Sequence, residues 1–161
     1  AWWRRAGLPE AKLYFAAKTF RLGQHRLTKV GSRRGVTFWN DSKATNFHAV
    51  EAALATFPAP VFWIGGGKAK GGDLPGFIDR IAGKIRHAYV IGETQPALTS
   101  LLREHQLPVT PTGSLDEAVH AAFAEATTGD NVLLSPGFAS FDMFRGYDDR
   151  GLQFESLVEN L

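Results

Sequence analysis

The sequence contains no cysteine, and no long apolar run. Without cysteine the chain can form no disulfide, no thiolate metal site and no thiol nucleophile, although its redox compartment stays undecided. No apolar stretch reaches the roughly 18 residues that a membrane-spanning helix needs, and no signal-peptide pattern is present. We therefore expect a cytoplasmic protein with no membrane partner.

A marked excess of one charge is also lacking. The 18 Lys and Arg residues and 16 Asp and Glu residues give a formal net charge of +2. The pI near 9.1 thus reflects a small surplus, and the composition does not point to a nucleic acid partner. A chain of 161 residues, 44% of them hydrophobic, can bury one full core and carry a short appendage.

Short apolar runs alternate with longer segments of helical periodicity along most of the chain. This alternation predicts a Rossmann-like α/β fold, with a mostly parallel six-stranded sheet flanked by helices on both faces. An early strand at 27–30, turned back by GSRRG, is expected to pair antiparallel at one edge. The other predicted strands are 36–39, 61–65, 88–92, 108–111 and 131–135. The predicted helices are 46–57, 74–85, 95–106, 114–127 and 142–160, with start signals at Asp73 and in a Ser114–Glu117 capping box.

The first 22 residues have a different character from the rest. They are aromatic-rich, and their apolar spacing predicts a helical piece that precedes the α/β alternation. We expect 1–22 to be left over from a neighbouring domain and 23–161 to form the α/β domain. The chain begins at Ala1 and not at Met, so we expect it to be part of a longer protein.

Three unusual loops each follow a predicted strand. They are NDSKATN at 40–46, GGGKAKGGD at 65–73 and SPGFASFDMF at 135–144. In an open parallel sheet, ligands bind outside the carboxyl ends of the strands, where loops meet the starts of helices. We therefore expect the three loops to open on one edge of the sheet and to form a ligand site together.

Each loop also has a plainer interpretation. A helix cap needs only one of the polar residues in NDSKATN, and the glycine loop could be a flexible turn with solvated lysines. The glycine loop does not match a Walker phosphate loop, because Lys68 is followed by Ala69 and Lys70 by Gly71. Ser140 and a following helix start would suit an anion. The sequence has no G-x-S-x-G motif and no metal-spaced histidine pair, so we predict neither a serine hydrolase nor a metal site.

Four motifs together resemble the C-terminal domain of the Mur ligases. They are HR at 25–26, NDSKATN at 40–46, IGGGKAKGGD at 64–73 and LLSPGFASFDMFRGYDDRG at 133–151, in the family's order and with similar spacing. NDSKATN most resembles the branch that adds D-glutamate. Residues 1–22 resemble the closing helical segment of the family's central ATPase domain, which agrees with their separate character.

The resemblance implies one part of an ATP-dependent amide ligase of peptidoglycan synthesis. In that family ATP phosphorylates the carboxylate of UDP-N-acetylmuramoyl-L-alanine, and the amine of D-glutamate attacks the acyl phosphate. The central domain holds most of the ATP and Mg²⁺, and the N-terminal domain holds the uridine group. The C-terminal domain supplies the amino-acid site and part of the nucleotide clamp, so it is expected to be inactive alone and to have the other two domains as partners.

The resemblance also assigns roles to single residues. Arg26 is expected to reach the ATP phosphates, Asp41 to accept hydrogen bonds from the ribose, and Asn40 to contact the nucleotide. Lys43 matches a motif lysine near the reacting phosphate, and Lys43, Asp41 and Arg26 form the expected catalytic set.

On the amino-acid side, Thr45 and Lys70 resemble the site for the α-carboxylate of D-glutamate. Ser140 and the backbone around Tyr147 resemble the site for the side-chain carboxylate, and Phe141 lines the pocket. A dianionic amino acid needs two separate anion sites, and these residue types can provide them.

Alternatives stay open. One is a sister ligase that adds another amino acid. A second is a freestanding α/β module that binds a small anion or nucleotide, with no Walker loop upstream of Ala1. A third is a structural or interaction domain, for which Lys70→Ala and Thr45→Ala would leave ligand binding unchanged.

Overall fold

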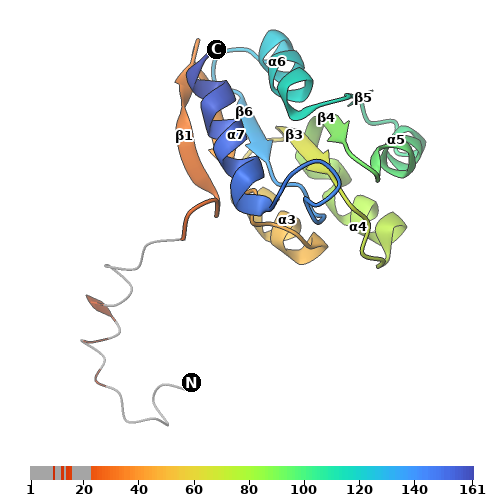
Figure 1. Ribbon diagram of the computed structural model, residues 1–161, viewed down its shortest axis with the longest axis horizontal. Helices are drawn as coiled ribbons and strands as arrows, with labels where there is room; N and C mark the ends of the chain where they lie inside the picture. Colours follow the sequence, from red (N-terminus) through yellow and green to blue (C-terminus); the bar gives the residue numbers. More distant parts are fainter. Residues whose placement is uncertain (1–8, 10–11, 13, 16–22) are drawn as a thin grey trace.

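The protein is described by a computed structural model over residues 9, 12, 14, 15 and 23–161. The predicted helical segment at 1–22 therefore lies almost wholly outside the described residues. Within 23–161 the chain forms a six-stranded sheet between two layers of helices (Figure 1). The predicted α/β class with a mostly parallel sheet is confirmed.

All six predicted strands are present, and their order in the sheet is β1-β2-β6-β3-β4-β5. β1 pairs antiparallel with β2 at one edge, as predicted, and every other neighbouring pair is parallel. β4 begins earlier than the predicted residue 88. The strands are β1 Thr28–Arg33, β2 Val36–Asn40, β3 Val61–Gly66, β4 Ile85–Ile91, β5 Val109–Pro111 and β6 Asn131–Leu134.

Side chains of the central strands point alternately to the two faces of the sheet, and each face has its own hydrophobic core. On β3, Val61 and Trp63 contact one layer of helices, whereas Phe62 and Ile64 contact the other. The first layer consists of α3 Phe47–Leu54, α4 Leu74–Ile81 and α5 Gln95–Glu104, with the 3₁₀ turn Ala82–Lys84 after α4. The second layer consists of α6 Leu115–Glu125 and α7 Tyr147–Glu159 (Figure 1).

The predicted helix starts at Asp73 and Ser114 are confirmed. The Asp73 carboxylate accepts a hydrogen bond from the Gly76 N–H at 3.0 Å, and the Ser114 hydroxyl accepts one from the Glu117 N–H at 3.1 Å. Asn46 caps α3, accepting from the Ala49 N–H at 3.0 Å. Asn46 alone caps α3, so the other polar residues of NDSKATN are not needed as caps of this helix.

The predicted start of the last helix at 142 is wrong, since α7 begins at Tyr147. The Asp142 carboxylate accepts a hydrogen bond from the Glu93 N–H at 2.8 Å, which ties this segment to the loop after β4. The N–H groups of Met143 and Phe144 both turn back to the Ser140 carbonyl. A contact between residues distant in the sequence thus holds 141–146 as a loop.

Candidate functional site

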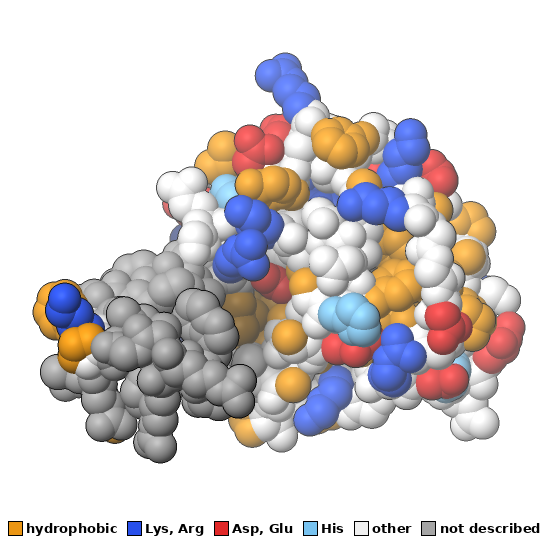
Figure 2. Space-filling view, turned by 90° about the horizontal axis from the view of Figure 1, so that it is seen from below, with side chains coloured by type: hydrophobic (Ala, Val, Ile, Leu, Met, Phe, Trp, Pro, Cys, Tyr) orange, Lys and Arg blue, Asp and Glu red, His pale blue; other side chains and the backbone are white. Residues whose placement is uncertain are grey.

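The three unusual loops meet at the carboxyl ends of β2, β3 and β6. The Gly137 N–H donates to the Ala44 carbonyl at 2.8 Å, which joins the loop after β6 to the loop after β2. The Lys68 N–H donates to the Ala139 carbonyl, also at 2.8 Å, which joins the glycine loop to the loop after β6. Figure 2 shows this end of the molecule, where several Lys and Arg side chains lie around a pale area of backbone and uncharged atoms.

Two glycines of the second loop are required by close backbone packing. Gly66 and Gly67 have backbone φ values of 109° and 140°, which residues other than glycine rarely adopt. A Cβ atom would collide with the Ile91 carbonyl oxygen at Gly66 and with the Ala139 carbonyl oxygen at Gly67. The start of the glycine loop is therefore packed against its neighbours and is not the flexible turn of the plainer interpretation.

The five predicted amino-acid-binding residues line one pocket of about 440 Å³. Thr45 enters from the first loop, Lys70 from the glycine loop, and the others from the third loop and the start of α7. Phe141 is 70% exposed at the rim, whereas Ser140 is only 2% exposed. The full lining is Thr45, Lys70, Ala139, Ser140, Phe141, Arg145, Gly146, Tyr147 and Asp148.

The pocket can supply cationic and polar groups to a ligand. The ion pairs found among the described residues include neither Lys70 nor Arg145, and both side chains are exposed. No side chain within 23–161 caps the start of α7, so its first-turn N–H groups are also available for hydrogen bonds. Cations beside free backbone N–H groups are suited to an anionic ligand.

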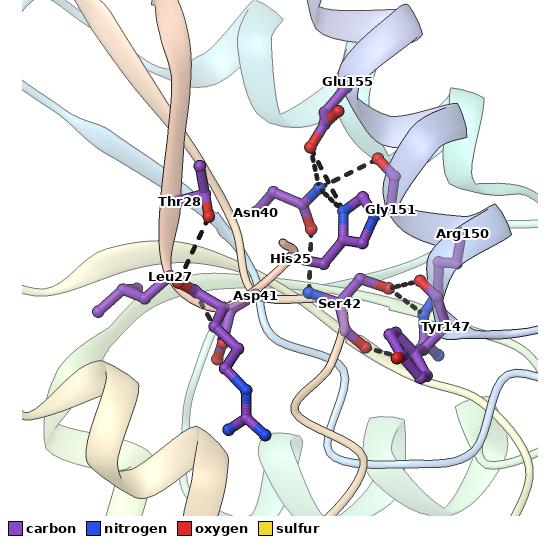
Figure 3. Close-up of polar contacts among 11 residues, drawn as sticks. His25, Leu27, Thr28, Asn40, Asp41, Ser42, Tyr147, Arg150, Gly151 and Glu155 are labelled. Carbon is purple, nitrogen blue, oxygen red and sulfur yellow. Dashed lines mark hydrogen bonds and ion pairs between the residues drawn. The ribbon is translucent and has the colours of Figure 1, made fainter. Parts of the chain in front are cut away.

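Asn40 faces the inside of the fold. Its side-chain amide lies 2.9 Å from the His25 ring nitrogen Nδ1, and it donates to the Gly151 carbonyl at 3.1 Å and to the Glu155 carboxylate at 2.7 Å (Figure 3). Its oxygen accepts from the Ser42 N–H at 3.0 Å. The expected nucleotide contact stays a prediction, since the side chain is fully buried and already ties β2 to α7.

His25 packs against α7 at its one glycine. A Cβ atom on Gly151 would collide with the His25 ring, so the glycine allows the ring to lie on the helix. The backbone of His25 has a φ of 59°, and its carbonyl accepts a hydrogen bond from the Lys43 N–H at 3.0 Å. The segment that carries Arg26 is therefore placed by α7 and by the first loop together.

Arg150 of α7 is a fully buried residue that we did not predict from the sequence. Its guanidinium donates to the Ser42 hydroxyl at 3.0 Å and to the Ser42 carbonyl at 2.8 Å (Figure 3). It also reaches the Phe138 carbonyl at 3.4 Å. Burial lowers the pKa of Arg150 to about 10, so it is still charged at neutral pH. The sequence could have indicated this burial, because the helical spacing of residues 150, 154 and 158 places them on one side of α7, and that side is buried.

Lys43 lies beside the pocket. Its ammonium group is 5.1 Å from the centre of the Tyr147 ring, a cation–π arrangement. The neighbouring Ser42 hydroxyl donates to the Tyr147 carbonyl at 2.7 Å, so the first loop contacts α7 through adjacent residues. Because Tyr147 lines the pocket, the Lys43 side chain lies at the edge of the pocket, two residues along the chain from Asp41.

Asp41 is 7% exposed, and its two carboxylate oxygens accept from the Leu27 N–H at 3.1 Å and from the Ser135 hydroxyl at 2.7 Å. Burial raises the pKa of Asp41 above its ordinary value, and the two hydrogen bonds and the charge of Arg26 only partly oppose this. Arg26 is exposed beside it. Since each carboxylate oxygen has two acceptor positions, Asp41 keeps capacity for a further donor.

The raised pKa of Asp41 predicts a pH dependence of stability. A folded pKa above the unfolded value adds stability below about pH 4 that is lost as the pH rises through the folded pKa. Asp41→Asn removes this loss, and the Ser135 hydroxyl can turn to accept from the new amide. We expect the unfolding free energy of Asp41→Asn, relative to wild type, to be larger at pH 7 than at about pH 4. Urea unfolding at both pH values checks this, and a difference that shrinks over the same interval would contradict it.

The described residues contain no group of three or more His, Cys, Asp or Glu side chains that could hold a metal ion. No helix in the described part of the chain is long and apolar enough to cross a membrane.

Comparison with known proteins relates these motifs to one family. Residues 25–138 match the family described as "Mur ligase, glutamate ligase domain". The chain is 46% identical over 137 residues to a UDP-N-acetylmuramoylalanine--D-glutamate ligase of Zymomonas mobilis, covering 85% of this chain and 31% of that one. A ligase of the same name from Protochlamydia amoebophila is 39% identical over 157 residues, covering 98% of this chain and 35% of that one. The chain thus spans about a third of the length of these relatives.

Solved structures share the fold at low sequence identity. The UDP-N-acetylmuramate-alanine ligase MurC of Thermotoga maritima superposes with a TM-score of 0.67 at 10% identity, covering 98% of this chain and 35% of that one. A bifunctional folylpolyglutamate synthase/dihydrofolate synthase of Yersinia pestis, complexed with AMPPNP and a Mn ion, superposes with a TM-score of 0.58 at 20% identity, covering 84% and 32%. At such identities the likeness concerns the fold.

Proposed function

The chain belongs to the Mur ligase family, and from this premise we propose that it is the C-terminal domain of the ATP-dependent ligase that adds D-glutamate to UDP-N-acetylmuramoyl-L-alanine. The main support for this proposal is that Thr45, Lys70 and Ser140, which come from three different loops, line the same pocket. The names of the similar ligases support D-glutamate as the amino-acid substrate in this proposal.

D-Glutamate carries two carboxylates, and the pocket offers groups for both. The Thr45 hydroxyl and the Lys70 ammonium bind the α-carboxylate in our proposal. Ser140 and the first-turn N–H groups of α7, beginning at Tyr147, bind the side-chain carboxylate, where the helix dipole favours a negative charge. Holding both carboxylates fixes the amine, and such positioning can accelerate amide formation by several orders of magnitude.

We propose that Arg26, Asp41 and Lys43 form the part of the site that binds the nucleotide. The exposed guanidinium of Arg26 is suited to phosphate, and Asp41 keeps acceptor capacity for a ribose hydroxyl. ATP would transfer its terminal phosphoryl group to the substrate carboxylate, which gives an acyl phosphate and releases ADP. The D-glutamate amine would then attack the acyl carbon, phosphate would leave, and the nitrogen would lose a proton as the amide bond forms. We propose that other domains of the ligase hold Mg²⁺, the rest of the ATP and the uridine group.

Amide NMR titration of the chain tests the amino-acid site. We expect D-glutamate to shift the amide signals of Thr45, Lys70 and Ser140, with L-glutamate as the matched control giving smaller shifts. The two enantiomers place the amine differently when both carboxylates are held, so only one can fit fully. Shifts of equal size for both enantiomers would contradict a D-specific site.

A kinetic measurement on the complete ligase tests the same proposal when the other domains are present to close the pocket. Phosphate release by the complete ligase should require both UDP-N-acetylmuramoyl-L-alanine and D-glutamate. Release that responds to another amino acid and not to D-glutamate would identify a sister ligase in place of the proposed one.

A further inference from the structure

Arg145 lines the amino-acid pocket but is absent from the set predicted by sequence resemblance. It precedes Gly146, the N-cap residue of α7, which begins at Tyr147. The Arg145 N–H donates to the Asp149 carboxylate at 3.0 Å, and the other oxygen of Asp149 accepts from the Gln153 side chain at 3.1 Å. The backbone of Arg145 is thus fixed to the first turn of α7.

The guanidinium of Arg145 is in a different situation from its backbone. It is exposed, and no ion pair or side-chain hydrogen bond involving it is found among the described residues. Buried Arg150, five residues on, has its donors directed to Ser42 and Phe138 inside the fold. Arg145 therefore presents its donors at the pocket without a hydrogen-bonded side-chain partner among the described residues, and the Asp149 carboxylate interacts with its charge only at longer range.

The charges that line the pocket explain why a second cation matters. Lys70 and Arg145 are positive and Asp148 is negative, so the lining carries a net charge of +1. Without Arg145 the lining itself would be neutral, because Lys70 and Asp148 would balance each other, and Lys43 lies beside the pocket and not in its lining. A guanidinium can also bind a carboxylate through two parallel hydrogen bonds, which an ammonium cannot do.

We propose that Arg145 is a specificity-determining residue that pairs with the side-chain carboxylate of the incoming amino acid. It selects a dianionic amino acid over the amide of the same length, D-glutamine, in which a neutral carboxamide replaces that carboxylate. Ser140 and the α7 N–H groups can serve an amide oxygen as well as a carboxylate, so they discriminate less between the two. This inference rests on the proposed function, because it concerns the same pocket and the same substrate.

A solvated arginine at the rim of a pocket is the simpler interpretation, and the two differ in the effect they predict. An exposed charge that only adds to the general field changes binding by a few-fold at most. A guanidinium that pairs directly with the ligand contributes about 10-fold or more. The size of the effect, and its dependence on the ligand's second carboxylate, therefore separate the two.

The test uses the complete ligase with Arg145→Gln, Arg145→Lys and, as a matched control, Arg103→Gln at an exposed arginine on α5. D-Glutamate is followed as substrate, and D-glutamine as substrate or competitive inhibitor. For Arg145→Gln we expect the KM for D-glutamate to rise about 10-fold or more, with D-glutamine binding and the KM for ATP within about twofold of wild type. Arg145→Lys should recover part of the loss, because it restores the charge but not the paired donors.

The outcomes distinguish this inference from the proposed function. A wild-type ligase that does not use D-glutamate would overturn the proposed function, and the inference with it. A wild-type ligase that uses D-glutamate, with an Arg145→Gln variant that keeps its preference over D-glutamine within twofold, would overturn the inference alone. Thermal unfolding of each variant verifies that a rise in KM does not reflect loss of folding.

Discussion

Arg150→Ala is expected to lower the free energy of unfolding by about 2–4 kcal/mol, the largest effect on stability that we predict for a single residue of the site. The substitution leaves the carbonyls of Ser42 and Phe138 without their donor in a buried place and opens a cavity beneath them. Loss of a buried charge returns part of its desolvation cost, which keeps the effect within this range.

Thermal unfolding measures this effect, with an expected fall in Tm of roughly 2–4 °C for each kcal/mol. Arg150→Lys should lie between wild type and Arg150→Ala, because one ammonium cannot serve all the acceptors that the guanidinium serves. Arg103→Ala on the surface of α5 is the matched control and should change stability by less than about 0.5 kcal/mol. Equal shifts for Arg150→Ala and Arg103→Ala would contradict a structural role for the buried guanidinium.

Lys70→Ala is expected to raise the KM of the complete ligase for D-glutamate by roughly 30- to 150-fold, the loss of one charge-assisted hydrogen bond of about 2–3 kcal/mol. The KM for ATP should change far less, because Lys70 lines the amino-acid pocket, whereas Arg26 and Asp41 are not among the residues that line it. Steady-state kinetics with each substrate varied in turn would show the difference.

Lys68→Ala provides the matched control for this prediction. Lys68 lies in the same glycine loop and is exposed, but its side chain does not line the pocket. Its N–H bond to the Ala139 carbonyl is unaffected by the substitution. Comparable rises in both KM values for Lys70→Ala, or an equal effect of Lys68→Ala, would reject the proposed role of Lys70.

Much of the fold could be predicted because local patterns agree with it. The apolar runs of β3 and β6 supply both faces of a buried sheet, so their composition marks them as central parallel strands. The caps at Asp73 and Ser114 act on N–H groups three residues away. The shared edge of the three loops follows from the parallel order of the strands, and Thr45, Lys70 and Ser140 are brought together there.

The predictions from the sequence fail, or miss a residue, where contacts between residues distant in the sequence determine the local structure. Asp142 has the composition of a helix cap, yet it bonds to the Glu93 N–H in another loop, and α7 begins later as a result. The direction of the Asn40 side chain depends on His25 and Glu155, which come from other segments. Sequence spacing cannot give such directions, because a loop side chain has no periodicity that assigns it to the inside or the outside.

Under the proposed function, the contact of His25 with Gly151 connects the amino-acid site and the phosphate site through α7. One end of the link is the pocket at the start of the helix, and the other is the segment of Arg26, which rests on the helix through His25. A tilt of α7 when the amino acid docks would move both ends together. Occupancy of the amino-acid pocket would thereby be transmitted to the phosphate side as a displacement of the arginine, without any contact between the two ligands.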